Sequence, residues 1–320
     1  MQTTLIILVT VFLILSIVIV LGVFAIAVVL LLRALKTKRD DKKFPETDLE
    51  VVDLSQELTE RAHKVTRHLL PKNEWKKFTK KKDGNSYEST LFVLDFRPKL
   101  RAREVQALRK EIDVITQVAT PKDEVLVRID SPGGTVPGYG QAASQLLRVH
   151  DRGIPLTICV DEIAASGGYM CAAVADKIIA APFAYIGSIG VVAGMPNFVG
   201  LMDKIGVRYL ELTAGESKRT LTPFSEPTPQ KEAIELERLQ AIHRAFKDLI
   251  KKRRPNLDID RVADGNYWLA IDAKELGLVD ILQTSDEYLI QQSKLNRRIL
   301  KVSCQPGRRR MLSNLLDTLG

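Results

Sequence analysis

Two glycine-rich turns hold the residues that could perform chemistry in this chain: DSPGG at 130–134 and AASGG at 164–168. In the second turn a hydroxyl meets backbone without side chains, so a substrate carbonyl could approach Ser166 closely while amide N–H groups face it. The pair Gly133-Gly134 could supply another N–H, and two such donors form an oxyanion hole, in which one donor contributes about 2.7 to 4 kcal/mol. Either turn alone is more typical of a simple tight turn. Together they indicate a serine nucleophile.

A serine nucleophile needs a general base, and the histidines are poor candidates for that role. His63 and His68 lie in a polar, lysine-rich stretch, and His150 and His243 lie in predicted helices among charged neighbours. A lysine or a carboxylate is therefore favoured, because a buried lysine can lose its proton near neutral pH and Ser-Lys pairs are a known variant of the serine triad. Lys218 directly follows a predicted strand and a glycine, but the chain has many other lysines, so spacing alone leaves the base open.

The composition argues against several other kinds of site. The three cysteines, Cys159, Cys171 and Cys304, form no CxxC pair, and the histidines show no metal-ligand spacing, so no metal or cofactor is expected. Cys159 and Cys171 lie in apolar stretches and are predicted to be core residues. Neither a P-loop nor a GxSxG motif is present. Much of the net charge of +8 lies in runs without interleaved aromatic residues, which favours a membrane surface over nucleic acid as the partner.

The elements that position the two turns are predicted to alternate between strands and helices. Short apolar runs indicate strands at 90–96, 124–130 and 155–160. Apolar residues at steps of three and four indicate a helix over 105–115, and a second helix is expected at 139–151. Alternating elements of this length imply parallel pairing with right-handed crossovers, which gives an α/β fold. Both turns then open at the carboxyl ends of neighbouring strands, where open α/β sheets bind their ligands.

The second half of the chain contains further strands and a long helix. Short strands are predicted at 177–181 and 207–212. Thr228 and Pro229 are typical of the N-cap and first turn of a helix. Gly277 is expected to end the last predicted helix.

The N-terminal segment 5–32 contains only apolar or small uncharged residues. As a helix it would be about 42 Å long, against a hydrocarbon core of about 30 Å. A cleaved signal peptide has a shorter apolar region after a basic start, which residues 1–4 lack, so a retained single-pass transmembrane helix is expected. Six basic residues between positions 33 and 43 follow this segment and none precedes it, so the positive-inside rule predicts a cytoplasmic soluble domain.

Several separated motifs resemble the signal peptide peptidase A family, and more closely its SohB-type branch. The likeness runs from about 92 to 286 and also includes the N-terminal segment with its charged connector. A set of motifs in the right order is far more specific than one glycine pair. The motifs are DSPGG at 130–134, IAASGGYM at 163–170, ADKI at 175–178, GSIGV at 187–191, AGESKRT at 214–220 and GLVD at 277–280.

The resemblance implies a ClpP/crotonase-like fold and assigns roles to individual residues. Ser166 matches the position of the family's nucleophile, and Lys218 matches the position of its lysine base. Backbone N–H groups of Gly133 and Gly167 are implied as oxyanion donors. Family members form bowl-shaped oligomers in which the lysine can come from a neighbouring subunit, so a homo-oligomer is implied, with the base acting within or between subunits. Ser217 departs from the family, which often has an aromatic residue before the lysine, and this difference concerns the packing of the base.

Composition and resemblance together predict four parts along the chain. The resemblance also implies a protein of the cell inner membrane. Many family members are assigned an exported peptidase domain, which conflicts with the cytoplasmic orientation that the charges predict. The four parts are a transmembrane anchor at 5–32, a basic juxtamembrane connector at 33–88, a ClpP/crotonase-like peptidase domain at 89–295 and a basic C-terminal tail at 296–320.

The resemblance implies a membrane-anchored serine endopeptidase that hydrolyses signal-peptide-like or membrane-associated polypeptides with a Ser-Lys dyad and no cofactor. Two alternatives stay open. In a non-catalytic oligomeric membrane scaffold, Ser166 would be incidental, and serine-directed reagents would not label it. A crotonase-type acyl-CoA enzyme shares paired oxyanion amides, but it requires a nucleotide-binding surface.

Overall fold

The computed structural model describes most of the chain after the N-terminal segment. The predicted transmembrane helix at 5–32 lies outside the described residues. Among the residues that are described, no helix is long and apolar enough to cross a membrane. The described residues are 48–71, 74, 87–215 and 218–305.

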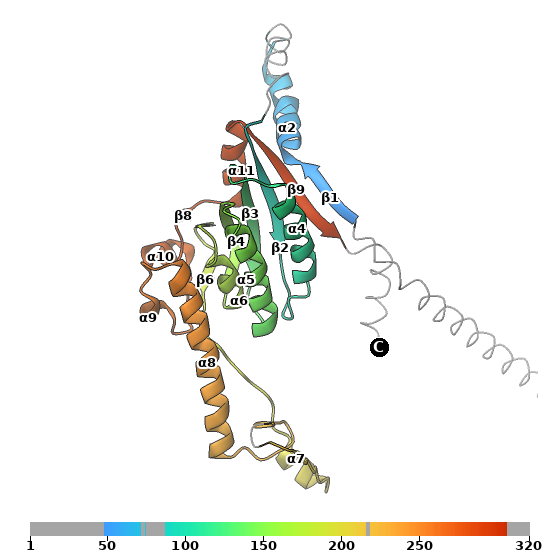
Figure 1. Ribbon diagram of the computed structural model, residues 1–320, viewed down its shortest axis with the longest axis vertical. Helices are drawn as coiled ribbons and strands as arrows, with labels where there is room; N and C mark the ends of the chain where they lie inside the picture. The colour runs from blue at the N-terminus through green and yellow to red at the C-terminus, as the bar shows by residue number, and fades with distance from the viewer. Residues whose placement is uncertain (1–47, 72–73, 75–86, 216–217, 306–320) are drawn as a thin grey trace, which may run out of the picture. The chain divides into compact units, whose positions relative to one another are not determined.

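A mostly parallel sheet forms the centre of the fold, with the strand order β1-β9-β2-β3-β4-β5-β8 (Figure 1). Strands β2, β3 and β4 are parallel neighbours, which confirms the α/β prediction. Strand β6 pairs with the end of β4, and β7 pairs antiparallel with β6. The strands are β1 (Asp48–Asp53), β2 (Ser89–Phe96), β3 (Glu124–Ser131), β4 (Leu156–Ala165), β5 (Lys177–Ala180), β6 (Tyr185–Gly187), β7 (Tyr267–Leu269), β8 (Ile281–Leu282) and β9 (Arg297–Gln305).

Helices cover both faces of the sheet, because alternate residues of each central strand point to opposite sides. In β2, Phe92 and Leu94 pack with α4, α5 and α6, whereas Leu91 and Val93 pack with α11 and α2. Figure 1 shows α4 and α5 lying across the strands on one side. The helices are α2 (Leu54–Leu69), α4 (Val105–Val118), α5 (Val136–His150), α6 (Gly167–Ala172), α7 (Val199–Lys204), α8 (Pro229–Arg253), α9 (Ile259–Val262), α10 (Ala270–Glu275) and α11 (Ser285–Lys294).

The expected basic tail at 296–320 is wrong for its first residues, because 297–305 form β9, which lies between β1 and β2 in the sheet. Two basic residues of β9 are paired with carboxylates of β2 and β3. Arg297 lies 2.7 Å from Glu124, and Lys301 lies 2.7 Å from Asp95.

Regular structure is already present within the predicted juxtamembrane connector at 33–88, because β1 pairs with β9. Helix α2 follows β1 within the same segment. Helix α2 begins after Asp53, whose side chain accepts a hydrogen bond from the N–H of Gln56 at 3.2 Å. Compact structure therefore begins well before residue 89, the expected start of the peptidase domain.

The strand predicted at 207–212 is absent, and these residues have no regular secondary structure. Their apolar side chains are exposed, since Leu210 retains 80% and Leu212 86% of its accessible surface. An apolar run becomes a buried strand only when a neighbouring strand or helix covers it. Among the described residues, no such neighbour covers this run.

The long helix α8 begins as predicted. The hydroxyl of Thr228 accepts a hydrogen bond from the N–H of Lys231, and Pro229 occupies the first turn. Gly277 follows α10 with a φ of +81°, which glycine adopts without steric cost, so its predicted position after a helix is confirmed. Four further helices, α6, α7, α9 and α11, were not predicted.

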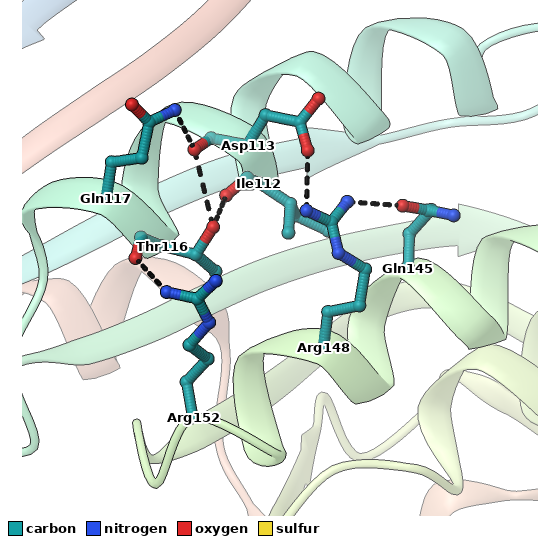
Figure 2. Close-up of polar contacts among 7 residues, drawn as sticks. All are labelled: Ile112, Asp113, Thr116, Gln117, Gln145, Arg148 and Arg152. Carbon is teal, nitrogen blue, oxygen red and sulfur yellow. Dashed lines mark hydrogen bonds and ion pairs between the residues drawn. The ribbon is translucent and has the colours of Figure 1, made fainter.

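Polar contacts fix α5 against α4 (Figure 2), which matters because α5 starts directly after the first glycine-rich turn. Arg148 on α5 donates hydrogen bonds to Asp113 on α4 at 2.6 Å and to Gln145 at 2.7 Å. Arg152, just beyond the end of α5, donates to the backbone carbonyl of Thr116 at 2.9 Å. These contacts hold the far end of the helix that carries the turn.

Glu111 is a buried carboxylate between α4 and β9. Its Oε1 accepts a hydrogen bond from the backbone N–H of Cys304 at 2.8 Å. Burial is the largest influence and raises the pKa of Glu111 to about 7; the hydrogen bond and Lys301 oppose the rise, and Asp95 adds to it. The native state therefore holds more protons than the unfolded state between the two pKa values.

The free energy of unfolding is accordingly expected to fall as the pH rises from about 4.5 to about 7 and to level off above that. The contribution of this one group is at most about 3 kcal/mol. Glu111→Gln keeps an acceptor for Cys304 but cannot ionise, so it should flatten the decline and be more stable than the wild type above pH 7. Urea unfolding across this pH range measures the slope, with Glu237→Gln on exposed α8 as the control. Equal slopes in Glu111→Gln and the wild type would contradict the prediction.

Candidate active site

The two glycine-rich turns lie side by side, because β3 and β4 are parallel neighbours that end at the same edge of the sheet. Ser131 is the last residue of β3 and pairs with Ala164 of β4. Strand β4 is longer than predicted and continues to Ala165, so Ser166 is the first residue after it. The serine is half-buried and stands directly before α6.

Ser166 has a strained backbone, with φ 51° and ψ −119°. Few residues other than glycine adopt this region, and such strain costs on the order of 1 to 3 kcal/mol. Two hydrogen bonds hold the conformation: the N–H of Ser166 donates to Gly187 at 2.8 Å, and its carbonyl accepts from Met170 at 2.9 Å. A serine in a sharp strand-to-helix turn is typical of nucleophiles whose hydroxyl must stand clear of the sheet.

Gly133 lies directly against Ser166 and Gly167. A Cβ atom added to Gly133 would lie 2.8 Å from the Cβ of Ser166, 2.9 Å from the carbonyl oxygen of Ala165 and 3.0 Å from the backbone nitrogen of Gly167. Gly133 also has a φ of +99°, so any side chain here would be strained as well as crowded. The structure thus brings three of the four predicted site residues together.

The backbone N–H groups of Gly133, Gly134 and Gly167 lie near Ser166, and they differ in whether they already have a hydrogen-bond acceptor. Gly167 is the first residue of α6, whose leading N–H groups have no acceptor within the helix. Among the described residues, the N–H groups of Gly167 and Gly134 have no hydrogen-bond acceptor. The N–H of Gly133 donates to Ser131 Oγ at 3.2 Å. Gly167 and the Gly133-Gly134 pair can therefore present N–H groups to an oxyanion.

Tyr139 and Ser131 support the turn and were missed from the sequence. The two hydroxyl oxygens lie 2.7 Å apart, both side chains are fully buried, and burial raises the pKa of Tyr139, which keeps its hydroxyl protonated. A Cβ atom on Gly167 would lie 2.4 Å from the ring of Tyr139. The sequence did contain a signal for these two residues: a serine ends a strand just before a glycine pair, and a tyrosine lies in the first turn of the helix that follows.

Lys218 is not brought to Ser166 within the single chain. It is exposed, in a segment without regular secondary structure, and its backbone N–H donates to Gly215 at 3.1 Å. Across the described residues, no hydrogen bond or ion pair joins the side chain of Lys218 to Ser166. Figure 1 shows α7, which precedes this segment, beyond the end of α8 that lies away from the strands. Ser217 lies outside the described residues.

The other titratable residues considered from the sequence lie elsewhere. Cys159 and Cys171 are buried free thiols, as predicted, and burial raises the pKa of both. His150 is partly exposed, as predicted for a surface residue, and lies 2.9 Å from Asp176. In the part of the chain that the structure describes, no group of three or more histidine, cysteine or carboxylate side chains is placed to hold a metal ion.

Comparison with known families identifies two matching models that together span most of the chain. "Peptidase family S49 N-terminal" matches residues 4–146, and "Peptidase family S49" matches residues 148–297. The first match includes the DSPGG turn, and the second includes both Ser166 and Lys218.

Two curated relatives carry the name "Probable protease SohB". The protein of Haemophilus influenzae is 42% identical over 284 residues, which are 82% of this chain and 80% of that protein. The protein of Buchnera aphidicola subsp. Acyrthosiphon pisum is 50% identical over 202 residues, 63% of this chain and 60% of that protein. Among solved structures, the 1510-N membrane-bound stomatin-specific protease aligns with a TM-score of 0.41 and 14% identity, over 65% of this chain and 86% of that one. The sequence matches carry the family assignment.

Proposed function

The chain belongs to peptidase family S49, together with SohB proteases, and from this premise we propose that it is a membrane-anchored serine endopeptidase with a ClpP/crotonase-like fold. Ser166 is the nucleophile, Lys218 is the general base, and backbone N–H groups at Gly133 and Gly167 bind the oxyanion. The observation that carries this proposal is the packing of Gly133 against Ser166 and Gly167 at the ends of two neighbouring strands.

The proposed reaction is acyl transfer to serine followed by hydrolysis. Ser166 Oγ attacks the carbonyl carbon of the scissile peptide while its proton passes to the neutral amine of Lys218. The tetrahedral oxyanion accepts hydrogen bonds from the N–H of Gly167 and from the Gly133-Gly134 turn. The C–N bond then breaks as Lys218 returns the proton to the leaving amine. Water attacks the resulting ester by the same route, releasing the acid and restoring Ser166.

Assembly of several copies would complete the site. A lysine accepts a proton readily only after burial has removed water from its ammonium group, and Lys218 is exposed in the single chain. The segment that carries it, 192–224, exposes an unusual number of large apolar side chains, which favours contact with another copy of the chain. We therefore propose a homo-oligomer that covers Lys218. The exposed side chains are Val192, Met195, Phe198, Leu201, Ile205, Val207, Tyr209, Leu210, Leu212 and Phe224.

The proposed substrates are polypeptides at or near a membrane, such as cleaved signal peptides and fragments of membrane proteins. The apolar segment at 5–32 supports this assignment, because an anchored enzyme meets such chains more often than dissolved ones. We propose that this segment spans the cell inner membrane once.

A serine-directed fluorophosphonate reagent tests the proposed dyad on the full chain in detergent. We expect the reagent to label Ser166, as located by peptide mapping, and the label to be lost in Lys218→Ala. Lys252→Ala removes an exposed lysine of α8 and should be labelled like the wild type. Labelling at a different serine, or labelling that persists in Lys218→Ala, would refute the dyad. Size-exclusion mass on the same samples shows whether loss of label reflects loss of assembly.

A further inference from the structure

The loop at 97–103, RPKLRAR, joins β2 to α4 at the same edge of the sheet as Ser166, and we name it the basic loop. We propose that the basic loop is a specificity element that selects substrate polypeptides with acidic side chains near the scissile bond. This proposal rests on the proposed peptidase function and concerns the substrate class of the same site.

Backbone contacts hold the basic loop against the first glycine-rich turn. The carbonyl of Leu100 accepts a hydrogen bond from the N–H of Thr135 at 2.9 Å, and a Cβ atom on Gly134 would lie 2.1 Å from the same oxygen. The hydroxyl of Tyr139 lies 3.3 Å from the carbonyl oxygens of Pro98 and Lys99. The loop therefore touches the residue next to Gly133, which in turn touches Ser166.

The side chains of the basic loop point away from these contacts. Arg97, Lys99, Arg101 and Arg103 are all exposed, whereas Pro98 and Ala102 are buried beneath them. Because the backbone is tethered through its carbonyl groups, the segment that carries the positive charges is held close to the first glycine-rich turn. A charge in a fixed position selects a partner better than one on a mobile segment, since less ordering is needed on binding.

The four basic side chains of the loop have no acidic partner among the described residues. In the described part of the chain, none of the four forms an ion pair, and the nearby carboxylate of Glu104 accepts a hydrogen bond from the backbone N–H of Lys99 at 3.2 Å. Several basic residues elsewhere in the fold are paired, as Arg128 is with Asp95 at 2.6 Å. A cluster of unpaired positive charge attracts anionic groups and raises their local concentration.

The basic loop also forms a hollow on the surface, which could receive an anionic side chain. It has a volume of about 330 Å³, and Leu100, which retains 68% of its accessible surface, adds an apolar contact. A hollow of this size can hold a side chain, which fits an extended acidic peptide better than it fits a flat lipid surface. The hollow is lined by Lys99, Leu100, Arg101, Arg103 and Glu104.

The test compares two fluorogenic peptides that differ only in Glu-Glu or Gln-Gln beside the scissile bond, in versions that place the pair on either side. The loop variant carries Gln at Arg97, Lys99, Arg101 and Arg103. The control variant removes the same charge by placing Gln at four exposed positions away from the turn, and it keeps the loop intact. These positions are Lys122, Arg244, Lys252 and Lys274.

We expect the wild type and the control variant to cleave the Glu-Glu peptide about tenfold faster in kcat/KM than the Gln-Gln peptide at low salt. The preference should fall to about twofold or less at 1 M salt, where the Debye length is about 3 Å. In the loop variant the ratio should be near one at all salt concentrations. A ratio near one in the wild type, or an unchanged ratio in the loop variant, would overturn the proposal.

Binding separates failure of this proposal from failure of the peptidase assignment. The same two peptides, labelled for fluorescence anisotropy, are titrated onto Ser166→Ala with and without the loop substitutions. A loop-dependent preference for Glu-Glu in binding supports the proposal even if the wild type cleaves neither peptide. Flotation with phosphatidylglycerol vesicles tests the alternative that the basic loop binds an anionic lipid surface. Loop substitutions that weaken vesicle binding and leave the peptide preference unchanged would mean that the loop contacts lipid, and the proposal would be wrong.

Discussion

Replacing Ser166 with alanine is expected to lower kcat/KM for peptide cleavage by at least about 10³-fold while the protein stays folded. The substitution removes the one atom that forms the acyl bond, and the backbone that presents it does not depend on the hydroxyl, because both of its hydrogen bonds are made by main-chain atoms. Steady-state cleavage of a fluorogenic peptide and circular dichroism measure the two effects. Ser144→Ala, at an exposed serine on α5, is the control and should cleave at the wild-type rate.

The strained backbone at Ser166 leads to a second expected result, which concerns the stability of two inactive variants. Glycine adopts a φ near 51° without the steric cost that alanine has, so Ser166→Gly should be as inactive as Ser166→Ala but more stable by about 1 kcal/mol. Chemical denaturation of both variants measures this difference. Residual cleavage near the wild-type rate in either variant would remove Ser166 from the mechanism, and a less stable glycine variant would contradict the strain.

Gly134→Ala is expected to lower kcat/KM by about 100-fold or more and also to destabilise the fold. The new Cβ atom would lie 2.1 Å from the carbonyl oxygen of Leu100 and 2.7 Å from the ring of Tyr139, both of which are held by hydrogen bonds. The turn must therefore move, and a shift of about 1 Å in a catalytic group costs on the order of 100-fold in rate. The overpacking itself is expected to cost about 1 to 3 kcal/mol.

Gly140→Ala is the matched control for this prediction. Gly140 lies on α5, only six positions further along, and an added Cβ atom meets nothing within 4 Å. Alanine should therefore stabilise the helix by roughly 0.5 to 1 kcal/mol through its higher helix propensity, with no loss of activity. Cleavage rate and urea unfolding are measured for both variants. Wild-type activity in Gly134→Ala would show that the turn does not organise the site.

The sequence alone determined the features that depend on short-range rules. The central strands showed as apolar runs, and alternation with helices implied parallel pairing, which placed both glycine-rich turns at one edge of the sheet. The cap at Thr228 and the glycine at 277 were equally readable, because each depends on a few adjacent residues. Convergence of Gly133 and Gly167 on Ser166 followed from these rules together.

Only the tertiary structure decided how charged and exposed segments are used. β9 contains several basic residues and was expected to be a tail; Glu124 and Asp95, which pair with two of them, lie far away in the chain. Ser131 and Tyr139 became part of the site because the pleat of β3 and the first turn of α5 bring their hydroxyls together. The apolar run at 207–212 has the composition of a strand but no neighbour to cover it. Periodicity reports which side chains prefer burial, whereas contacts between distant segments decide which of them are buried.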